Sequence, residues 1–361
     1  MKTLLLIPSV AKHAALAEAE SGHHPVMDYH ALARGLEGDG GGTVDLVDYA
    51  AVEADTHSIV RAALRTAGKD AALAAYGYVR RLQYDAIFTN GENVGIPLAL
   101  LLKSVARRPR HVMIGHRLST GKKRLFFTKL HAEMAIDVIL LYATTQLQFA
   151  NKELGIDFQK LKLIPFHADH RFYAPGVANN VRQDQICAAG LEWRDYPTLL
   201  TAVESMPDLA VRLAAASPWS KHTDETANRK LPPNVDARRY EYAALRDLYA
   251  QSAFVVVPLY ENDFQAGVTT MLEAMAMGKT VIATRTSGQT DVITDRVNGL
   301  YVAPGDVNGW REAIALVRRD QALRERLATA AREWLVANAS LDRWVANVRE
   351  SLYPNPERKN L

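Results

Sequence analysis

The sequence predicts an α/β protein made of two doubly wound domains. Short runs rich in Val, Ile and Leu alternate with longer helix-like segments, which is the pattern of parallel strands joined by helical crossovers. The alternation stops at Phe166–Asn180, a stretch without a clear period that contains Pro175 and Gly176, and then restarts. The length of 361 residues also suits two domains. We therefore expect two such domains to face each other across a cleft.

The first domain is expected to span residues 1–168, and its strands are short runs that are largely apolar. Such runs suit strands that are covered on both faces. Strands are expected at Thr3–Pro8, Thr43–Val47, Ala86–Thr89, His111–Gly115, Val138–Leu141 and Leu161–Ile164. Helices are expected at His30–Leu36, His57–Arg81, Val94–Val105 and Gln146–Leu154.

The second domain is expected to span residues 169–339 and repeats the alternation. Strands are expected at Gln185–Ala189, Ala210–Ala214, Phe254–Val257, Thr280–Thr284 and Gly299–Val302. Helices are expected at Pro197–Ser205, Glu241–Gln251, Gly267–Met277 and Gly309–Arg319. The stretch Asp320–Leu352 is strongly helical, and we expect a C-terminal helix at about residues 340–361 to pack back on the first domain.

The composition excludes several classes of protein. A hydrophobic fraction of 48%, a charged fraction of 23% and a net charge of +3 are typical of a globular chain and not of a disordered one. A single Cys excludes a disulfide framework and a Cys-based metal site. Apolar runs fall short of the roughly 18–20 residues that span a bilayer. The first run, Leu4–Ile7, is too short for a signal peptide, so we expect a cytoplasmic protein.

The segment around residues 254–304 carries the strongest functional pattern. A buried strand, Phe254–Val257, leads through a loop to a helix that begins near Gly267 and ends at Gly278. Backbone N–H groups at the start of this helix (Gly267, Val268, Thr269) suit an anion such as a diphosphate. Glu273 lies about two turns into the helix among apolar neighbours, and a buried carboxylate needs partners. It can accept hydrogen bonds from the vicinal hydroxyls of a sugar.

Three consecutive motifs resemble one enzyme family. The run Glu273–Lys279 resembles the donor-site signature of retaining glycosyltransferases of GT-B fold in glycosyltransferase family four, the glycosyl transferases group 1. Downstream, Ser287–Ile293 resembles the G-G-x-P-E-V-V loop of that family, and Asn298–Asp306 resembles its N-G-x-L-V-P-P-G-D segment. The resemblance covers most of the second half and implies two Rossmann-like domains.

The resemblance also implies roles for individual residues. Glu273, the second Glu of the E-x7-E motif, would bind the ribose hydroxyls of a sugar nucleotide. The first Glu is replaced by Gln265, which can hydrogen-bond a sugar but cannot act as a charged base. In the basic pair that grips the diphosphate, Leu191 replaces the Arg and Arg194 best matches the Lys. Lys279 is a further candidate for the diphosphate.

The first half resembles the family less closely. The end of the strand His111–Gly115 resembles the position where a His approaches the donor sugar, which makes His116 a candidate catalytic residue beside Gln265. The segment Gly115–Lys122 mimics a phosphate-binding P-loop but has five residues between its glycines instead of four. A dinucleotide-binding motif is missing, which disfavours a dinucleotide oxidoreductase. Metal-binding motifs are missing as well, so we expect no metal cofactor.

A basic segment with bulky apolar residues lies in the first half. Nine Lys and Arg and no acidic residue fall between Lys103 and His131. The segment Lys122–Leu130 would suit an anionic membrane surface, with the cations in contact with lipid headgroups and the apolar side chains in the interface. The patch comprises Lys122, Lys123, Arg124, Phe126 and Phe127. The alternative is a solvated helix whose phenylalanines join the core. We expect no nucleic-acid partner, because no recognised module accompanies the patch.

Together these features predict a glycosyltransferase. It would move a sugar from a nucleoside-diphosphate donor to a glycan or lipid-linked acceptor, with retention of configuration and with peripheral contact at the inner face of the membrane. Two alternatives stay open: a non-catalytic protein of this fold that binds a sugar nucleotide, and an epimerase or phosphorylase on the same fold.

Overall fold

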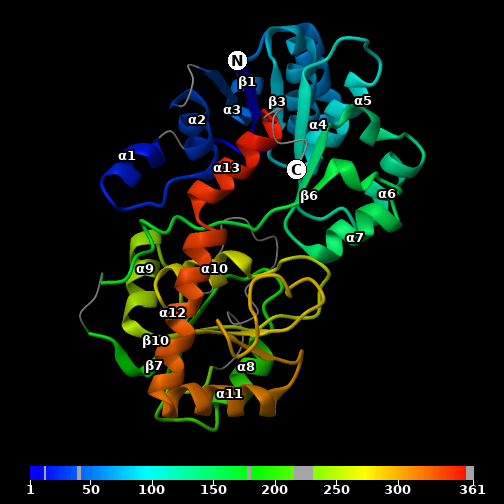
Figure 1. The fold of residues 1–361 in the computed structure, drawn as a ribbon. Coiled ribbons are helices and arrows are strands. Elements are labelled where there is room, and N and C mark those ends of the chain that lie inside the picture. The colour runs from blue at the N-terminus through cyan, green and yellow to red at the C-terminus, as the bar shows by residue number, and fades with distance from the viewer. Residues whose placement is uncertain (12–13, 39–41, 177–179, 215–230, 355–361) are drawn as a thin grey trace. The chain divides into compact units, whose positions relative to one another are not determined.

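The computed structural model describes residues 1–11, 14–38, 42–176, 180–214 and 231–354. They form two compact units (Figure 1). Unit 1 takes its residues from Met1–Leu16, Val26–Ile164 and Trp344–Leu361, and unit 2 from Ala17–Pro25 and Pro165–Arg343. Residues 177–179 of the expected linker and 355–361 of the expected C-terminal helix lie outside the described residues. The predicted α/β class is confirmed, because each unit is built on a parallel six-stranded sheet.

The sheet of unit 1 has the strand order β2-β1-β3-β4-β5-β6, and every neighbouring pair is parallel. All four residues of the inner strand β3 are buried, as expected for a run covered on both faces. All carboxyl ends therefore lie at one edge of the sheet. The strands are β1 (Lys2–Leu6), β2 (Thr43–Val47), β3 (Ala86–Thr89), β4 (Arg110–Gly115), β5 (Val138–Leu141) and β6 (Leu161–Leu163).

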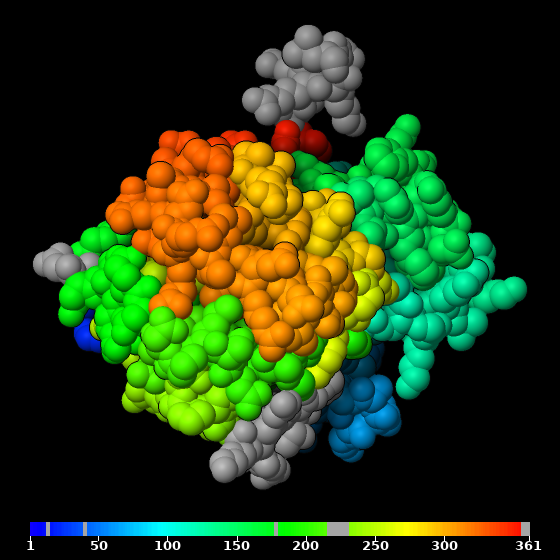
Figure 2. Space-filling view, turned by 90° about the horizontal axis from the view of Figure 1, so that it is seen from below, coloured from blue at the N-terminus to red at the C-terminus, as the bar shows by residue number. Residues whose placement is uncertain are grey.

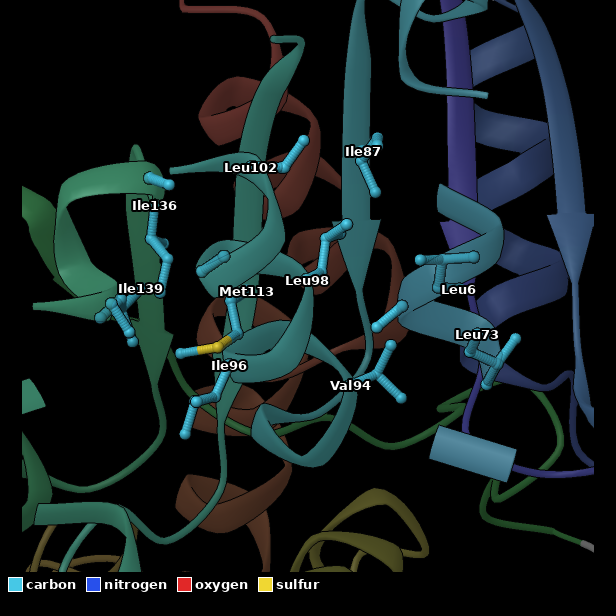
Figure 3. Packing of buried hydrophobic residues seen from close by; sticks show 14 of the residues in the cluster. Leu6, Leu73, Ile87, Val94, Ile96, Leu98, Leu102, Met113, Ile136 and Ile139 are labelled. Carbon is cyan, nitrogen blue, oxygen red and sulfur yellow. The ribbon is translucent and has the colours of Figure 1, made fainter. Parts of the chain in front are cut away.

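The helices of unit 1 bury apolar faces against this sheet. Figure 3 shows Leu98 and Leu102 of the apolar helix α5 in one buried cluster with Ile87 and Met113 of the sheet. Long α4 is interrupted at Gly68, whose positive φ of 87° departs from helical geometry. The helices are α2 (Asp28–Gly38), α3 (Tyr49–Ala54), α4 (Ser58–Val79), α5 (Glu92–Leu102), α6 (Gly121–Thr128), α7 (Thr144–Lys152) and most of α13 (Leu341–Leu352), while α1 (Ala14–Glu20) extends from unit 1 into unit 2.

The sheet of unit 2 has the order β12-β11-β10-β7-β8-β9 and is also parallel throughout. Its central strand β10 is buried at all six positions. Its strands are β7 (Arg182–Ala189), β8 (Ala210–Ala214), β9 (Val235–Arg238), β10 (Ser252–Val257), β11 (Val281–Thr284) and β12 (Leu300–Val302).

Helices cover both faces of this second sheet. Figure 1 shows α10 beside α12, and Figure 2 shows α11 and α12 in orange against the green segment that contains α8. The helices are α8 (Tyr196–Val203), α9 (Tyr242–Gln251), α10 (Val268–Ala276), α11 (Val307–Arg319) and α12 (Gln321–Asn338). Within the described ranges, no helix is both long enough and apolar enough to cross a membrane.

The structure differs from the predicted elements in several places: the short helices α1 and α3 were not predicted, nor were one edge strand and a break in the C-terminal helical stretch. The edge strand β9 was not predicted, because only Val235 of its four residues is buried and the others carry a polar, half-exposed pattern. The helical stretch Asp320–Leu352 divides at Ala339 and Ser340, where Ser340 forms a parallel bridge with Ala168. Trp344 after this break is buried in unit 1 and packs edge-on against Phe88, with their ring centroids 6.2 Å apart.

Candidate functional site

Three loops meet at the carboxyl edge of the unit 2 sheet. They follow β7, β10 and β11, and backbone groups tie them together: Tyr260 N donates to Trp193 O at 3.1 Å, and Asp195 N donates to Pro258 O at 3.1 Å. The hydroxyl of Thr284, the last residue of β11, accepts from Leu259 N at 2.9 Å. This edge is the usual ligand position of parallel α/β sheets.

Helix α10 starts at this edge with its N-terminus among the loops. Gly267 has a φ of 77°, and a Cβ at this position would lie 2.8 Å from Val257 Cγ1, so glycine allows the close turn. The amide of Val268 donates to Gln265 O at 3.3 Å, which takes one of the three predicted anion-binding amides into the turn. Thr269 is exposed at the start of the helix. The positive end of the helix dipole therefore remains at this edge.

Arg194 lies buried beside the start of α10. Its Nε donates to Ala189 O at 2.8 Å, and Nη1 donates to Glu192 O at 2.8 Å. Nη2 donates to Thr270 Oγ1 at 3.1 Å, which links the loop after β7 to α10. Glycines make room for it, since a Cβ on Gly190 would lie 2.5 Å from Nη2. Burial lowers the pKa of this guanidinium, but Arg stays protonated in proteins.

Glu273 lies one turn after Thr270 and is also buried. The hydroxyl of Tyr249 on α9 donates to Glu273 Oε2 at 2.9 Å. Burial raises the pKa of Glu273 to about 7, although the phenols of Tyr249 and Tyr173 and the charge of Arg194 oppose the rise. The predicted burial of this carboxylate is thus observed, and its partners are two tyrosines and an arginine. An acid with this pKa changes its charge near neutral pH.

Two buried amide oxygens near the start of α10, one on the loop before it and one on the loop after β11, have no hydrogen-bond partner among the described residues. Gln265, at the position of the first motif Glu, is 9% exposed, and its Oε1 has no hydrogen bond there. Gln289 on the facing loop donates through Nε2 to Ala266 O at 2.9 Å, while its own Oε1 also has no partner in the described part of the chain. Buried acceptors of this kind are expected to meet water or ligand.

The structure does not bring Lys279 to this site. Lys279 follows α10 and lies at the amino end of the sheet, where its Nζ donates to Ala250 O at 2.7 Å and to Ser252 O at 2.8 Å. Burial lowers its pKa to about 8. Its ammonium caps the carbonyls that precede and begin β10, so its role in the fold is structural.

Gly288 allows the loop after β11 to touch the loop before α10. A Cβ at Gly288 would lie 2.2 Å from the backbone oxygen of Phe264 and 2.3 Å from its nitrogen. We expect Gly288→Ala to force the loops apart and to lower the free energy of unfolding by about 1–3 kcal/mol in urea titrations. Gly121→Ala is the control, since a Cβ there meets nothing within 4 Å. Equal stability of the two variants would contradict this account.

His116 lies in unit 1, in the loop at the carboxyl end of β4. Its ring is exposed, and its centroid lies 5.6 Å from that of Tyr142, which follows β5. The loop is held by Glu92, the first residue of α5: the carboxylate accepts from His116 N at 2.9 Å and from Lys123 Nζ at 2.6 Å. Burial alone would raise the pKa of Glu92, but His116 and Lys123 keep it below its ordinary value. The loop therefore presents His116 in a fixed place.

Further polar groups gather at the same edge of unit 1. Asn90, directly after β3, donates through Nδ2 to Asp28 Oδ2 at 3.1 Å. Tyr142 accepts from Trp344 Nε1 at 3.0 Å, and burial raises the pKa of its phenol. Amide, carboxylate and imidazole groups at one edge suit a ligand rich in hydroxyls.

The basic patch of unit 1 has a different composition from the predicted one. Lys122 and Arg124 are exposed, but Lys123 turns inward to Glu92 and to Arg117 O. Phe127 is 1% exposed and joins the core, because it lies on the inner face of α6, and Phe126 packs partly against the same core. The prediction that both phenylalanines enter a membrane interface is therefore wrong for Phe127.

Several residues of these sites were not predicted from the sequence. Glu92 carried a usable signal, since it opens a helix directly after a strand and Gly91, at a carboxyl edge. Gln289 lies in the predicted Ser287–Ile293 motif, but its bond to Ala266 did not follow from it; Tyr249 carried no signal, because its contact with Glu273 joins segments that are far apart in the sequence. Among the described residues, no group of three or more His, Cys, Asp or Glu side chains could hold a metal ion.

Comparison with known sequences finds a family match in the second half of the chain. Residues 186–320 match the glycosyl transferases group 1. The D-inositol 3-phosphate glycosyltransferase of Kribbella flavida is 37% identical over 204 residues, which are 50% of this chain and 47% of that protein. The lipopolysaccharide core biosynthesis glycosyltransferase LpsE of Rhizobium meliloti is 40% identical over 70 residues, 19% of this chain and 21% of that protein. The chain thus spans about half the length of the first relative.

Solved structures extend the likeness over both units. A glycosyltransferase from Rickettsia africae has a TM-score of 0.71 at 15% identity and covers 98% of this chain and 99% of its own. Anabaena Alr3699/HepE in complex with UDP and glucose has a TM-score of 0.67 at 17% identity, with coverages of 98% and 100%. The predicted GT-B fold is therefore confirmed, and residues 186–320 match the glycosyl transferases group 1 family.

Proposed function

We propose that this chain is a glycosyltransferase that takes its sugar from a nucleoside diphosphate donor. The buried pair Arg194 and Glu273 at the carboxyl edge of unit 2 carries the proposal. In it, residues 169–339 bind the donor, with Glu273 on the ribose hydroxyls and Arg194 near the diphosphate. The UDP in the Anabaena structure supports a nucleotide at this fold's donor site.

Departure of the nucleoside diphosphate places negative charge on its β-phosphate. Arg194 and the N-terminal end of α10 (Gly267, Val268, Thr269) supply positive charge at that point, and such prearranged electrostatics is commonly the largest contribution to catalysis. We propose that the configuration at the sugar is retained and that no metal ion takes part. Gln265 carries no charge, so retention does not pass through a carboxylate at that position, and Gln265 acts by hydrogen-bonding the sugar.

The acceptor is proposed to bind to unit 1, at the sheet edge where His116 follows β4 and Asn90, bonded to Asp28, follows the neighbouring strand β3. These groups suit an acceptor that offers several hydroxyls, either a glycan or a lipid-linked sugar. The name of the Kribbella relative, which acts on D-inositol 3-phosphate, makes a cyclic polyol phosphate a second acceptor to test.

Release of nucleoside diphosphate tests the proposal. The purified protein is incubated with UDP-, GDP- and ADP-sugars, with and without a panel of saccharides and D-inositol 3-phosphate, and the released diphosphate and the anomeric configuration of product are measured. Transfer to an acceptor supports the proposal. Binding without release or transfer would favour the non-catalytic alternative. That alternative is supported by the replacement of the family's Glu and Arg by Gln265 and Leu191. Conversion of the sugar nucleotide itself, or of a sugar with free phosphate, would identify an epimerase or a phosphorylase.

We also propose that the protein works in the cytoplasm and touches an anionic membrane through α6. Lys122, Arg124 and Lys129 are exposed there beside Leu125 and Leu130, whose side chains are 55% and 43% exposed and whose backbones are joined by a 3.2 Å hydrogen bond. Exposed cations beside exposed leucines suit lipid headgroups and the interface below them.

Reversal of these charges tests the membrane contact. We expect Lys122→Glu with Arg124→Glu to reduce co-sedimentation with vesicles that contain anionic lipid at least tenfold, because each cation near such a surface contributes about 1 kcal/mol. Lys123 is left intact, since its ion pair with Glu92 holds the His116 loop. Arg61→Glu with Arg65→Glu, exposed positions on α4, is the matched control. Wild-type protein that stays in the supernatant would overturn the contact.

A further inference from the structure

Tyr249 is a buried tyrosine that lies outside the family motifs and touches the proposed ribose carboxylate. It is the third-last residue of α9 and is fully buried, and its hydroxyl donates to Glu273 Oε2 at 2.9 Å. The ring of Tyr173 lies 6.2 Å from that of Tyr249 between centroids. A buried hydroxyl aimed at a buried carboxylate fixes the orientation of that carboxylate and favours its charged form.

Three side chains act on the carboxylate of Glu273, and Tyr249 makes the well-defined hydrogen bond among them. Titratable or charged groups that face Glu273 come from three elements: Tyr249 from α9, Tyr173 from the segment before β7, and Arg194 from the loop after β7. Tyr249 further neighbours Cys187 of β7, and Tyr173 neighbours Tyr242 and Asp169. Three N–H groups of Arg194 donate hydrogen bonds to Ala189 O, Glu192 O and Thr270 Oγ1. Both phenols oppose the rise in the pKa of Glu273, and the 2.9 Å hydrogen bond to its Oε2 comes from Tyr249.

We propose that Tyr249 is a positioning residue for Glu273: its hydroxyl holds one carboxylate oxygen, so that the group stays ionised and turns its other oxygen toward the ribose of the bound nucleotide. The inference rests on the proposed donor site. It assigns to α9, a helix without a recognised motif, control over the pH range in which the donor binds. Loss of the hydroxyl leaves Glu273 buried with less compensation, so that its pKa, already raised to about 7, rises further.

Binding of UDP, measured by calorimetry from pH 6 to pH 9, tests the proposal. We expect Tyr249→Phe to weaken UDP binding about tenfold at pH 7, and the loss to shrink toward pH 9, where Glu273 ionises again. Tyr84→Phe is the matched control, since Tyr84 donates to Asp45 Oδ2 at 2.8 Å in unit 1. Equal affinity of Tyr249→Phe and wild type, or a loss that is the same at every pH, would overturn the proposal; the latter would mark a purely structural role.

Titration of Glu273 without ligand separates this inference from the proposed function. Carboxyl 13C NMR of the free protein should place the Glu273 midpoint near pH 7 in wild type and higher in Tyr249→Phe. Wild type that binds no UDP, GDP or ADP would refute the donor site while this titration still decides the role of Tyr249. If Tyr249→Phe does not fold, 3-fluorotyrosine at position 249 serves instead, because its more acidic hydroxyl should lower the midpoint. An unmoved midpoint in either protein overturns the inference.

Discussion

Glu273→Gln is expected to remove most of the affinity for sugar nucleotides while making the free protein more stable at pH 8. The variant keeps the shape of the side chain but loses the charged group that we propose as the acceptor for the ribose hydroxyls. Each hydrogen bond to a charged group contributes about 1.5–3 kcal/mol, so a loss in affinity of about a hundredfold is expected. Calorimetry with UDP measures it.

The gain in stability follows from the sign of the pKa shift. The folded pKa of Glu273, about 7, lies above the ordinary 4.5, so the group favours folding fully below pH 4.5 and this contribution is lost as the pH rises through 7. At pH 8 the buried charge costs at most about 3 kcal/mol, from about 1.36 kcal/mol per pKa unit. A neutral Gln that still accepts from Tyr249 avoids this cost.

Urea unfolding of Glu273→Gln and wild type at pH 5 and pH 8 provides the measurement. We expect the variant to be more stable at pH 8 and nearly equal at pH 5. Glu325→Gln, an exposed position on α12, is the control and should change neither binding nor stability. Unchanged UDP affinity, or lower stability at pH 8, would contradict the placement of Glu273.

Arg194→Met is expected to cause the largest loss of turnover, at least a thousandfold in kcat/KM. The variant removes the buried cation that the proposed mechanism uses for the leaving diphosphate, and interactions formed with developing charge each contribute several kcal/mol. It also removes the three hydrogen bonds that Arg194 donates to Ala189 O, Glu192 O and Thr270 Oγ1, so the free energy of unfolding should fall by several kcal/mol, although Ala189 O keeps Thr270 Oγ1 as a donor at 3.3 Å.

A second buried arginine in unit 2 separates the two effects. Arg324 on α12 donates through Nη1 to Val317 O at 2.9 Å and through Nη2 to Gln183 Oε1 at 2.5 Å, at the amino-end side of β7. Arg324→Met should lose comparable stability but keep UDP affinity and turnover below its unfolding temperature. Equal turnover in the two folded variants would show that Arg194 serves only the fold.

The fold was largely predictable because periodicity and burial agree in most strands. Val255–Val257 and Ile87–Phe88 are apolar on both faces and fully buried, so their sequences identify them without tertiary information. Val235–Arg238 failed this test because an edge strand is covered on one side only and its sequence there resembles a loop. Hydrogen bonds to β8, which join distant segments, make it a strand.

The placement of a site residue was predictable where its neighbours in the sequence also determine its surroundings in the fold. Glu273 lies in a recognisable helix, and its apolar neighbours predicted its burial. The directions of long side chains were harder to predict, since Lys279 ends the Glu273–Lys279 motif yet reaches carbonyls at the opposite end of the sheet. The same flexibility of a four-carbon chain sends Lys123 inward to Glu92 while its neighbour Lys122 stays in solvent. Composition does not encode these directions.

The division of the chain has a consequence for exchanging halves between relatives. The backbone passes from one unit to the other four times, after Leu16, Pro25, Ile164 and Arg343. A single junction after Ile164 would therefore strip unit 1 of Trp344, the donor to Tyr142 beside His116, and would strip unit 2 of residues 17–25. A chimeric protein that combines unit 1 of one relative with unit 2 of another therefore needs all four junctions. A chimera made with a single junction is expected to misfold.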